Sequence, residues 1–149
     1  MTELSIRAAE PADADALVTL VAEFYGEAHY RFDAPVTRRA VARLLADGEV
    51  GRAWLATVDG RTAGYAVVTF GFSLEYGGRD AFVDELFVRP AHRRRGLGER
   101  LLATIESAAA EHGVGALHLE VEGDNDGAAS LYRRRGFAGN ARRLLTKRI

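Results

Sequence analysis

Residues 83–98 read Val-Asp-Glu-Leu-Phe-Val-Arg-Pro-Ala-His-Arg-Arg-Arg-Gly-Leu-Gly, and no other stretch of the chain is as informative. The first part has the apolar pattern of a buried strand, interrupted by the adjacent carboxylates Asp84 and Glu85. A turn at Pro90 follows, and an Arg- and Gly-rich bend then opens into an amphipathic helix. Backbone N–H groups at a helix start lack intrahelical partners, and the helix dipole favours negative charge there. The stretch therefore predicts a phosphate-bearing ligand at residues 93–99.

Three kinds of phosphate-binding loop compete for this bend. A P-loop has Lys followed by Ser or Thr after its last glycine, whereas Gly98 is followed here by Glu99 and Arg100. A Rossmann fingerprint has a third glycine, which the bend lacks. The pattern that fits is Arg-x-x-Gly-x-Gly, which Arg93, Gly96 and Gly98 fill.

A second motif follows in the last quarter of the chain. Its members stand at fixed spacings: Asn125, Ala128, Tyr132, Gly136 and Phe137. Together and in this order, the two motifs resemble the signatures of the GCN5-related N-acetyltransferase (GNAT) superfamily. The resemblance is firm over residues 52–147 and weak over residues 1–50.

The resemblance implies a fold and a cosubstrate. Family members are α/β (α+β) proteins whose central sheet is mixed and mostly antiparallel, with helices on both faces. Two middle strands splay apart and hold acetyl-coenzyme A, and a backbone bulge near Leu86 frees an N–H group for the oxyanion. The residues expected to contact the coenzyme are Leu86, Phe87, Val88, Arg93, Arg94, Arg95, Gly96, Leu97, Gly98, Glu99, Asn125 and Tyr132.

Acetyl transfer to an amine requires a base, because a primary amine with a pKa of about 10 is mostly protonated at neutral pH. In parts of the family an acidic residue on the central strand relays this proton through water, so both Asp84 and Glu85 are candidates. Neighbours on a strand point to opposite faces, which predicts that Asp84 lies with Phe82 and Glu85 lies with Phe87. A structural ion pair with an arginine is the alternative role for either carboxylate.

The departing coenzyme thiol leaves more easily if it receives a proton. The resemblance places Tyr132 at the sulfur as this acid, whereas the alternative is a tyrosine that only packs its helix on the sheet. Asn125 either orients the coenzyme or caps the helix that begins at Asp126. With no cysteine in the chain, an acetyl-cysteine intermediate is excluded, and direct attack in a ternary complex is the simpler route.

The sequence says less about the binding site for the acceptor amine than about the coenzyme site. Two connections are expected to form its wall, and their candidate substrate-binding residues are Glu27, Tyr30, Glu75 and Tyr76. The carboxylates favour a small cationic amine, such as a polyamine, an aminoglycoside or a lysine side chain. Solvated surface charges are an equally good interpretation of the same residues.

Composition narrows the class of protein. A chain of 149 residues fits one domain, residues 1–149, and a net charge of −1 argues against nucleic-acid and membrane partners. The four histidines lack metal-ligand spacing, so we expect no metal. The absence of cysteine, of a signal-peptide pattern and of a long apolar run is compatible with the cytoplasm. Because many family members dimerise, a homodimer is among the expected assemblies.

The coarse element pattern agrees with this interpretation. Strands are predicted at residues 5–8, 53–58, 62–72, 81–88, 117–121 and 142–147, and helices after Pro11, from Thr37, from Leu97 and at 126–135. We therefore predict an acetyl-coenzyme A-dependent N-acetyltransferase. The alternatives are a protein lysine or N-terminal acetyltransferase and a non-catalytic acyl-coenzyme A-binding module.

Overall fold

The computed structural model describes all 149 residues, which form two compact units. The core unit spans residues 1–119 and contains the sheet with helices α1 to α3. The C-terminal unit spans residues 120–149 and contains helix α4, Asp126–Arg134.

The core unit is built on a five-stranded sheet with the order β1-β2-β3-β4-β5. Its strands are β1 (Leu4–Ala8), β2 (Gly51–Val58), β3 (Arg61–Ser73), β4 (Gly78–Val88) and β5 (Ala116–His118). The first three pairings are antiparallel and the β4–β5 pairing is parallel, which confirms the mixed, mostly antiparallel sheet. The β2–β3 turn falls at Asp59 and Gly60, whose φ angles of 49° and 76° are those of a tight hairpin.

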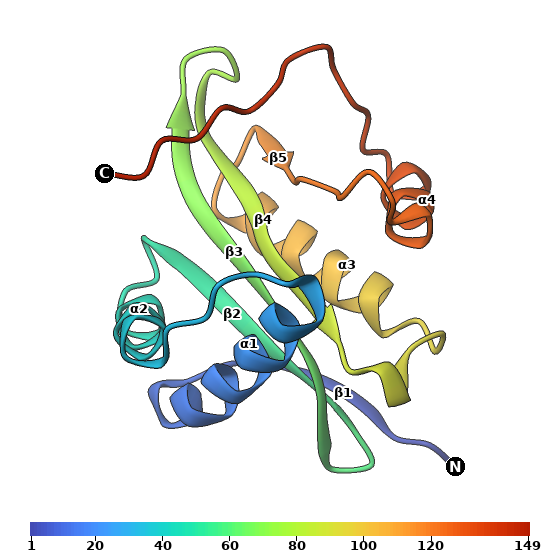
Figure 1. Cartoon of the computed structure of the whole chain (residues 1–149). Coiled ribbons are helices and arrows are strands. Elements are labelled where there is room, and N and C mark those ends of the chain that lie inside the picture. The colour runs from blue at the N-terminus through green and yellow to red at the C-terminus, as the bar shows by residue number, and fades with distance from the viewer. The chain divides into compact units, whose positions relative to one another are not determined.

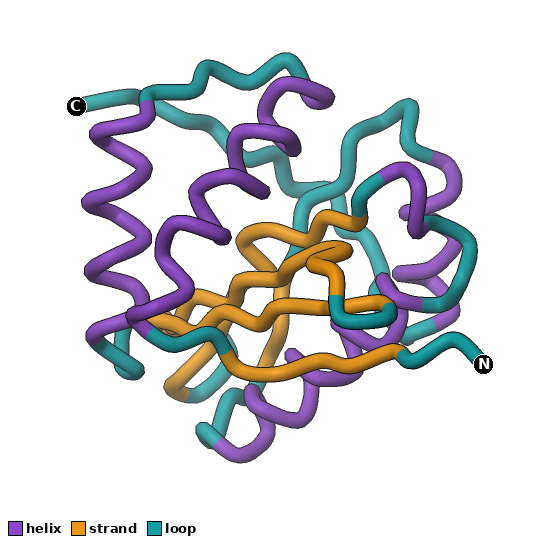
Figure 2. The backbone as a smooth tube through the Cα atoms, turned by 90° about the horizontal axis from the view of Figure 1, so that it is seen from below, coloured by secondary structure: helices purple, strands orange, loops and turns teal.

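Helices cover both faces of this sheet. They are α1 (Ala14–Ala28), after the short 3-10 turn η1 (Pro11–Asp13), then α2 (Ala34–Ala46), and α3 (Leu97–Glu111), after the turn η2 (Pro90–His92). Figures 1 and 2 show α1 and α2 on one face and α3 on the opposite face.

Strand alternation explains why two helical layers are needed. On one face, Leu55, Tyr65 and Val67 pack in a buried cluster with Leu17 and Leu20 of α1. The residues between them, Trp54, Ala66 and Val68, point to the other face and are buried under α3, whose Leu101, Leu102 and Ile105 are fully buried. Both faces of β2 and β3 are therefore apolar, and these strands carry the core.

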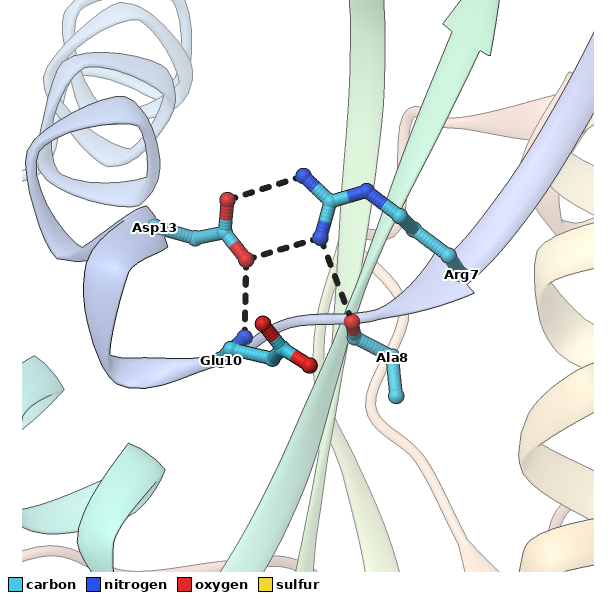
Figure 3. Close-up of polar contacts among 4 residues, drawn as sticks. All are labelled: Arg7, Ala8, Glu10 and Asp13. Atoms are coloured by element: carbon cyan, nitrogen blue, oxygen red, sulfur yellow. Dashed lines mark hydrogen bonds and ion pairs between the residues drawn. The ribbon is translucent and has the colours of Figure 1, made fainter.

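The junction between β1 and α1 is fixed by one ion pair (Figure 3). Arg7 donates two hydrogen bonds of 2.8 Å to the Asp13 carboxylate, which also accepts from the backbone N–H of Glu10 at 2.8 Å. These hydrogen bonds favour the ionised carboxylate and hold the pKa of Asp13 at about 2. The pair thus sets the direction in which the chain enters α1.

Strand β4 contains a bulge at Asp84. Val83 lies opposite Val68 of β3 and Glu85 lies opposite Val67, so the register skips Asp84. One extra residue reverses the alternation, and Phe82, opposite Thr69, shares its face with Glu85. The predicted grouping of Phe82 with Asp84 is therefore wrong, because it assumed a regular strand.

Pairing between β4 and β5 is short. Only Asp80, Ala81 and Phe82 have partners on β5, while β4 continues to Val88. The two strands therefore part after Phe82, as the predicted splayed pair requires.

Three predicted elements differ from the structure. Residues 142–147 form no strand, and Leu144 and Leu145 are exposed, because their side chains lack the sheet partner that a strand pattern presupposes. Strand β5 ends at His118 rather than at residue 121. Helix α2 begins before Thr37, since the Asp33 side chain accepts from the N–H of Val36 and acts as the cap. None of the helices has the length and apolar character needed to cross a bilayer.

Candidate active site

Glu85 is the centre of the polar cluster in the core unit. It projects from β4 toward α1 and accepts hydrogen bonds from two tyrosine hydroxyls, those of Tyr25 on α1 and of Tyr65 on β3. The Tyr65 bond measures 2.7 Å. The Tyr65 side chain is fully buried, so its hydroxyl needs a partner, and Glu85 provides one.

Burial controls the ionisation of this cluster. Desolvation raises the pKa of Glu85 above that of an ordinary glutamate, and the nearby Asp84 carboxylate acts in the same direction. The two tyrosine hydrogen bonds oppose this effect, because they favour the charged carboxylate. Both tyrosines in turn have raised pKa values, chiefly through desolvation, and remain neutral donors. The cluster is suited to accepting a proton at Glu85.

Asp84 has a different setting. It is the bulged residue of β4 and its side chain is exposed, in contrast to the half-buried Glu85. The bulge predicted near Leu86 thus lies two residues earlier on the same strand. The remaining predicted residues of this strand, Leu86, Phe87 and Val88, follow the bulge on the part of β4 that has left β5.

The predicted phosphate loop connects η2 to α3. Arg94 and Gly96 both have left-handed backbones, with φ angles of 63° and 80°, and Gly96 is the N-cap of α3. These conformations turn the chain sharply so that α3 begins at Leu97, whose side chain is buried and anchors the helix in the core. Arg95 is exposed, while Gly98 and Glu99 lie in the first turn of the helix. The N–H groups of this first turn have no partners within the helix and can hold an anion.

Two arginine–glutamate pairs tie α1 to this region. Glu23 forms a bidentate pair with Arg89, at 2.9 and 2.7 Å. One turn further along α1, Glu27 accepts two hydrogen bonds from Arg93, at 2.7 and 2.8 Å. Arg93 also donates to the backbone oxygen of Val88 at 2.8 Å. The pairs hold the α1 turn that carries Tyr25 against the end of β4.

These contacts change the interpretation of two predicted residues. Glu27 was expected in the acceptor wall and Arg93 at the pyrophosphate, but in the structure their side chains bind each other. Tyr30 follows α1 and packs edge-on against Phe24 and Tyr25 at ring distances of 5.9 and 5.6 Å, close to the Glu85 cluster. Glu75 and Tyr76 lie in the β3–β4 turn, and the Tyr76 ring contacts His118 of β5 at a ring distance of 5.0 Å.

The C-terminal unit holds the other two predicted residues. The Asn125 side chain accepts from the N–H of Ala128 at 3.1 Å and caps α4, so the predicted capping role is confirmed. Tyr132 lies in the last turns of α4 and packs edge-on against Phe137 at a ring distance of 6.1 Å. Burial raises the pKa of its phenol, which therefore keeps its proton at neutral pH.

Sequence reasoning missed Tyr25 and Tyr65 as partners of Glu85. A signal was present for Tyr65, because a tyrosine within the apolar run of β3 needs a hydrogen-bond partner once it is buried. No such signal marks Tyr25, since only the folded α1 brings it to β4. The structure has no group of three or more His, Cys, Asp or Glu side chains that could hold a metal ion.

Comparison of the sequence with known proteins points to a single family of acetyltransferases. The family model described as acetyltransferase (GNAT) family matches residues 14–137. The chain is 40% identical over 106 residues to a mycothiol acetyltransferase of Kineococcus radiotolerans, covering 71% of this chain but only 33% of that protein. It is 30% identical over 155 residues to a streptothricin acetyltransferase of Streptomyces lavendulae, covering 89% of this chain and 80% of the relative.

Solved structures agree with this assignment. An integron cassette protein from the mobile metagenome of Cole Harbour salt marsh superposes with a TM-score of 0.87 at 38% identity, covering 97% of this chain and 90% of that one. An aminoglycoside N-acetyltransferase in complex with CoA superposes with a TM-score of 0.85 at 16% identity, covering 99% and 96%, which shows the shared fold. With the matched residues spanning the helices, the bulged strand and both sequence motifs, the chain belongs to the acetyltransferase (GNAT) family.

Proposed function

We propose that the protein transfers an acetyl group from acetyl-coenzyme A to the primary amine of a small cationic molecule by direct attack. The observation that carries this proposal is the Glu85 cluster. A half-buried carboxylate with a raised pKa lies on a bulged strand, and the left-handed loop at the start of α3 follows that strand in the chain. A base for the amine and an anion site for the coenzyme thus lie at the two ends of one strand segment.

Each chemical step has a residue available. The free amine attacks the thioester carbonyl, so a C–N bond forms and the C–S bond breaks. The proton lost by the nitrogen passes to Glu85 through water, and the departing sulfur takes a proton from Tyr132. Asp84 remains the alternative base, and its exposure makes it the weaker candidate because its charge is better solvated.

The strand and loop backbone supply the binding contacts in this proposal. A backbone N–H group freed at the Asp84 bulge would stabilise the oxyanion. The open edge of β4 at Leu86, Phe87 and Val88 would pair with the pantetheine arm, and residues 94–99 would receive the pyrophosphate. Because Arg93 is already paired with Glu27, Arg94 and Arg95 are the better sources of added positive charge.

Two observations support a small cationic amine as the acceptor: the names of the relatives and the charge of the side chains near the β3–β4 turn. The relatives are named mycothiol acetyltransferase and streptothricin acetyltransferase, after small molecules rather than proteins. Exposed carboxylates and aromatic rings near the β3–β4 turn suit a cationic amine rather than an anionic one. We propose that the protein acts on this small molecule in the cytoplasm, and that a homodimer is one assembly in which it could do so.

Thiol release from acetyl-coenzyme A tests the proposal directly. Because the chain has no cysteine, Ellman's reagent reads only the coenzyme thiol. We expect release that depends on one class of amine within a panel of polyamines, aminoglycosides, amino acids and basic peptides. Release with basic peptides alone would favour a protein acetyltransferase. No release with any amine, although acetyl-coenzyme A binds, would favour a non-catalytic module.

A further inference from the structure

A second polar cluster lies where β4 and β5 pair, and it has no part in the proposed acetyl transfer at Glu85. Asp80 of β4 and His118 of β5 form a pair, with 3.1 Å between Asp80 Oδ2 and His118 Nε2. The rings of Phe82 and Tyr76 both contact the imidazole in tilted geometry, at centroid distances of 4.9 and 5.0 Å. The cluster thus combines a carboxylate, an imidazole and two aromatic rings.

Asp80 is the only buried charged residue of the chain, with 9% of its surface exposed. Its carboxylate lies over Gly71 of β3, where a Cβ atom would come within 2.8 Å of Oδ1. The adjacent cation, Arg79, points away and pairs with Glu49. The ion-pair partner of Asp80 is therefore an imidazole, that of His118, rather than an arginine or a lysine.

The two rings are unusually open for large aromatic side chains beside a buried carboxylate. Phe82 and Tyr76 each expose 40% of their surface. A ring face next to a negative charge attracts a cation, because the ring quadrupole and the carboxylate act in the same direction. These rings and this pair are complementary to an ammonium group.

The cluster lies on the same face of the sheet as Glu85. Phe82 and Glu85 face the same side because of the Asp84 bulge, and His118 lies opposite Phe82 on β5. Their partners on β3, Thr69 and Val67, are two residues apart, so Phe82 and Glu85 are separated along the strand by roughly 7 Å at about 3.3 Å per residue. A molecule extended along β4 could reach both positions.

We infer that Asp80, His118, Phe82 and Tyr76 form a subsite for a second ammonium group of the acceptor, so that the preferred substrate is a diamine or polyamine. This inference rests on the proposed function, because it assumes acetyl transfer near Glu85. It assigns a specificity role to Asp80, His118 and Phe82, and it places Tyr76 at the distal end of the substrate. The terminal amine that reacts lies at Glu85 and the other lies over the two rings.

Matched amines separate this inference from the proposed function. Cadaverine and pentylamine share one carbon chain and differ in a single terminal ammonium group. We expect kcat/KM for cadaverine to exceed that for pentylamine by about tenfold or more at pH 8, where an ordinary imidazole is neutral. Acetylation of both amines at equal rates would overturn the subsite and leave the proposed function intact. Acetylation of no amine would overturn the proposed function itself.

Substitutions then locate the subsite. Phe82→Ala and Asp80→Asn should each lower the cadaverine-to-pentylamine ratio severalfold toward one. Phe72→Ala is the control, because Phe72 is an exposed ring of the same hairpin that lies on the opposite face of β3 and should leave the ratio unchanged. Thermal unfolding of each variant confirms that it is folded. A ratio that Phe82→Ala does not lower in a folded protein would overturn the assignment.

Discussion

Glu85 shows how the chemistry of one residue depends on its neighbours. A glutamate in water would be ionised at neutral pH and would be a weak base. In this protein desolvation raises its pKa, while the hydroxyls of Tyr25 and Tyr65 keep the carboxylate oriented and partly offset that shift. A pKa nearer the working pH makes a carboxylate a better proton acceptor.

The choice between the two adjacent carboxylates can be made by kinetics. Glu85→Gln should lower kcat/KM by about 10²-fold or more and abolish the acidic limb of the pH–rate profile, since it removes the general base. Asp84→Asn is the matched control on the same strand and should retain the limb. A retained limb in Glu85→Gln and a lost limb in Asp84→Asn would reverse the assignment.

Removal of the Tyr65 hydroxyl should shift the same limb. The hydrogen bond from Tyr65 lowers the pKa of Glu85, so its loss in Tyr65→Phe raises that pKa further. The acidic limb of kcat/KM should therefore move to higher pH, which a pH series on the variant measures. A limb that stays in place or moves to lower pH would show that Glu85 is not the titrating group.

Tyr132 is expected to act after the attack, on the departing sulfur. Tyr132→Phe should lower kcat by about 10-fold or more with a smaller change in the KM for acetyl-coenzyme A, because it removes a proton donor but keeps the ring. Steady-state kinetics with acetyl-coenzyme A as the varied substrate distinguishes these parameters. An unchanged kcat would exclude the role.

At the scale of elements, helix α1 is held at both ends by charged pairs. Asp13 and Arg7 fix its start relative to β1, while Glu23 and Glu27 bind Arg89 and Arg93 at the end of β4. Each pair is at least partly exposed, so each contributes little to stability alone. Their shared effect is positional, because they fix the helix that brings Tyr25 to Glu85.

The Asp13 pair should make stability depend on pH. Its pKa of about 2 lies below that of an ordinary aspartate near ~3.9, so its contribution is complete above pH ~4 and is lost as pH falls toward 2. Asp13→Asn should cost about 1 kcal/mol at pH 7, and this deficit should vanish at the acid end of a urea-unfolding series. Asp124→Asn, at an exposed position of the C-terminal unit, should cost nothing.

At the scale of the whole molecule, the predicted coenzyme contacts fall in both units. Residues 86–99 belong to the core unit, whereas Asn125 and Tyr132 belong to the C-terminal unit. That the two units work as one acetyltransferase domain is still a prediction. Ligand binding would then stabilise them together, by an amount set by ligand concentration and affinity.

Hydrogen exchange can test this coupling. Acetyl-coenzyme A should slow amide exchange in the first turn of α3 and also in α4, if both units contact it. Helix α2, on the opposite face of the sheet from α3, serves as the internal reference and should change less. Protection confined to α3 would show that the C-terminal unit does not take part in binding.

The sequence by itself determined the elements whose signals are local. Asp59-Gly60 specifies the β2–β3 turn through its positive φ angles, and Gly96 marks the start of α3 for the same reason. Strand and helix periodicity located most of the sheet and all four helices, although the start of α2 was placed too late. The strand predicted at residues 142–147 is absent, because a strand pattern in the sequence does not show whether the sheet has an edge free to pair with it.

Only the tertiary structure decided which side chains meet. Tyr25 and Glu85 are 60 residues apart, Tyr65 and Glu85 are 20 apart, and Glu27 and Arg93 are 66 apart, so their contacts depend on strand register and helix docking. The bulge at Asp84 likewise depends on pairing with β3, and it moves Phe82 to the face of Glu85. Local patterns encode backbone preferences, whereas the site is made of contacts that exist only once the sheet and α1 are packed.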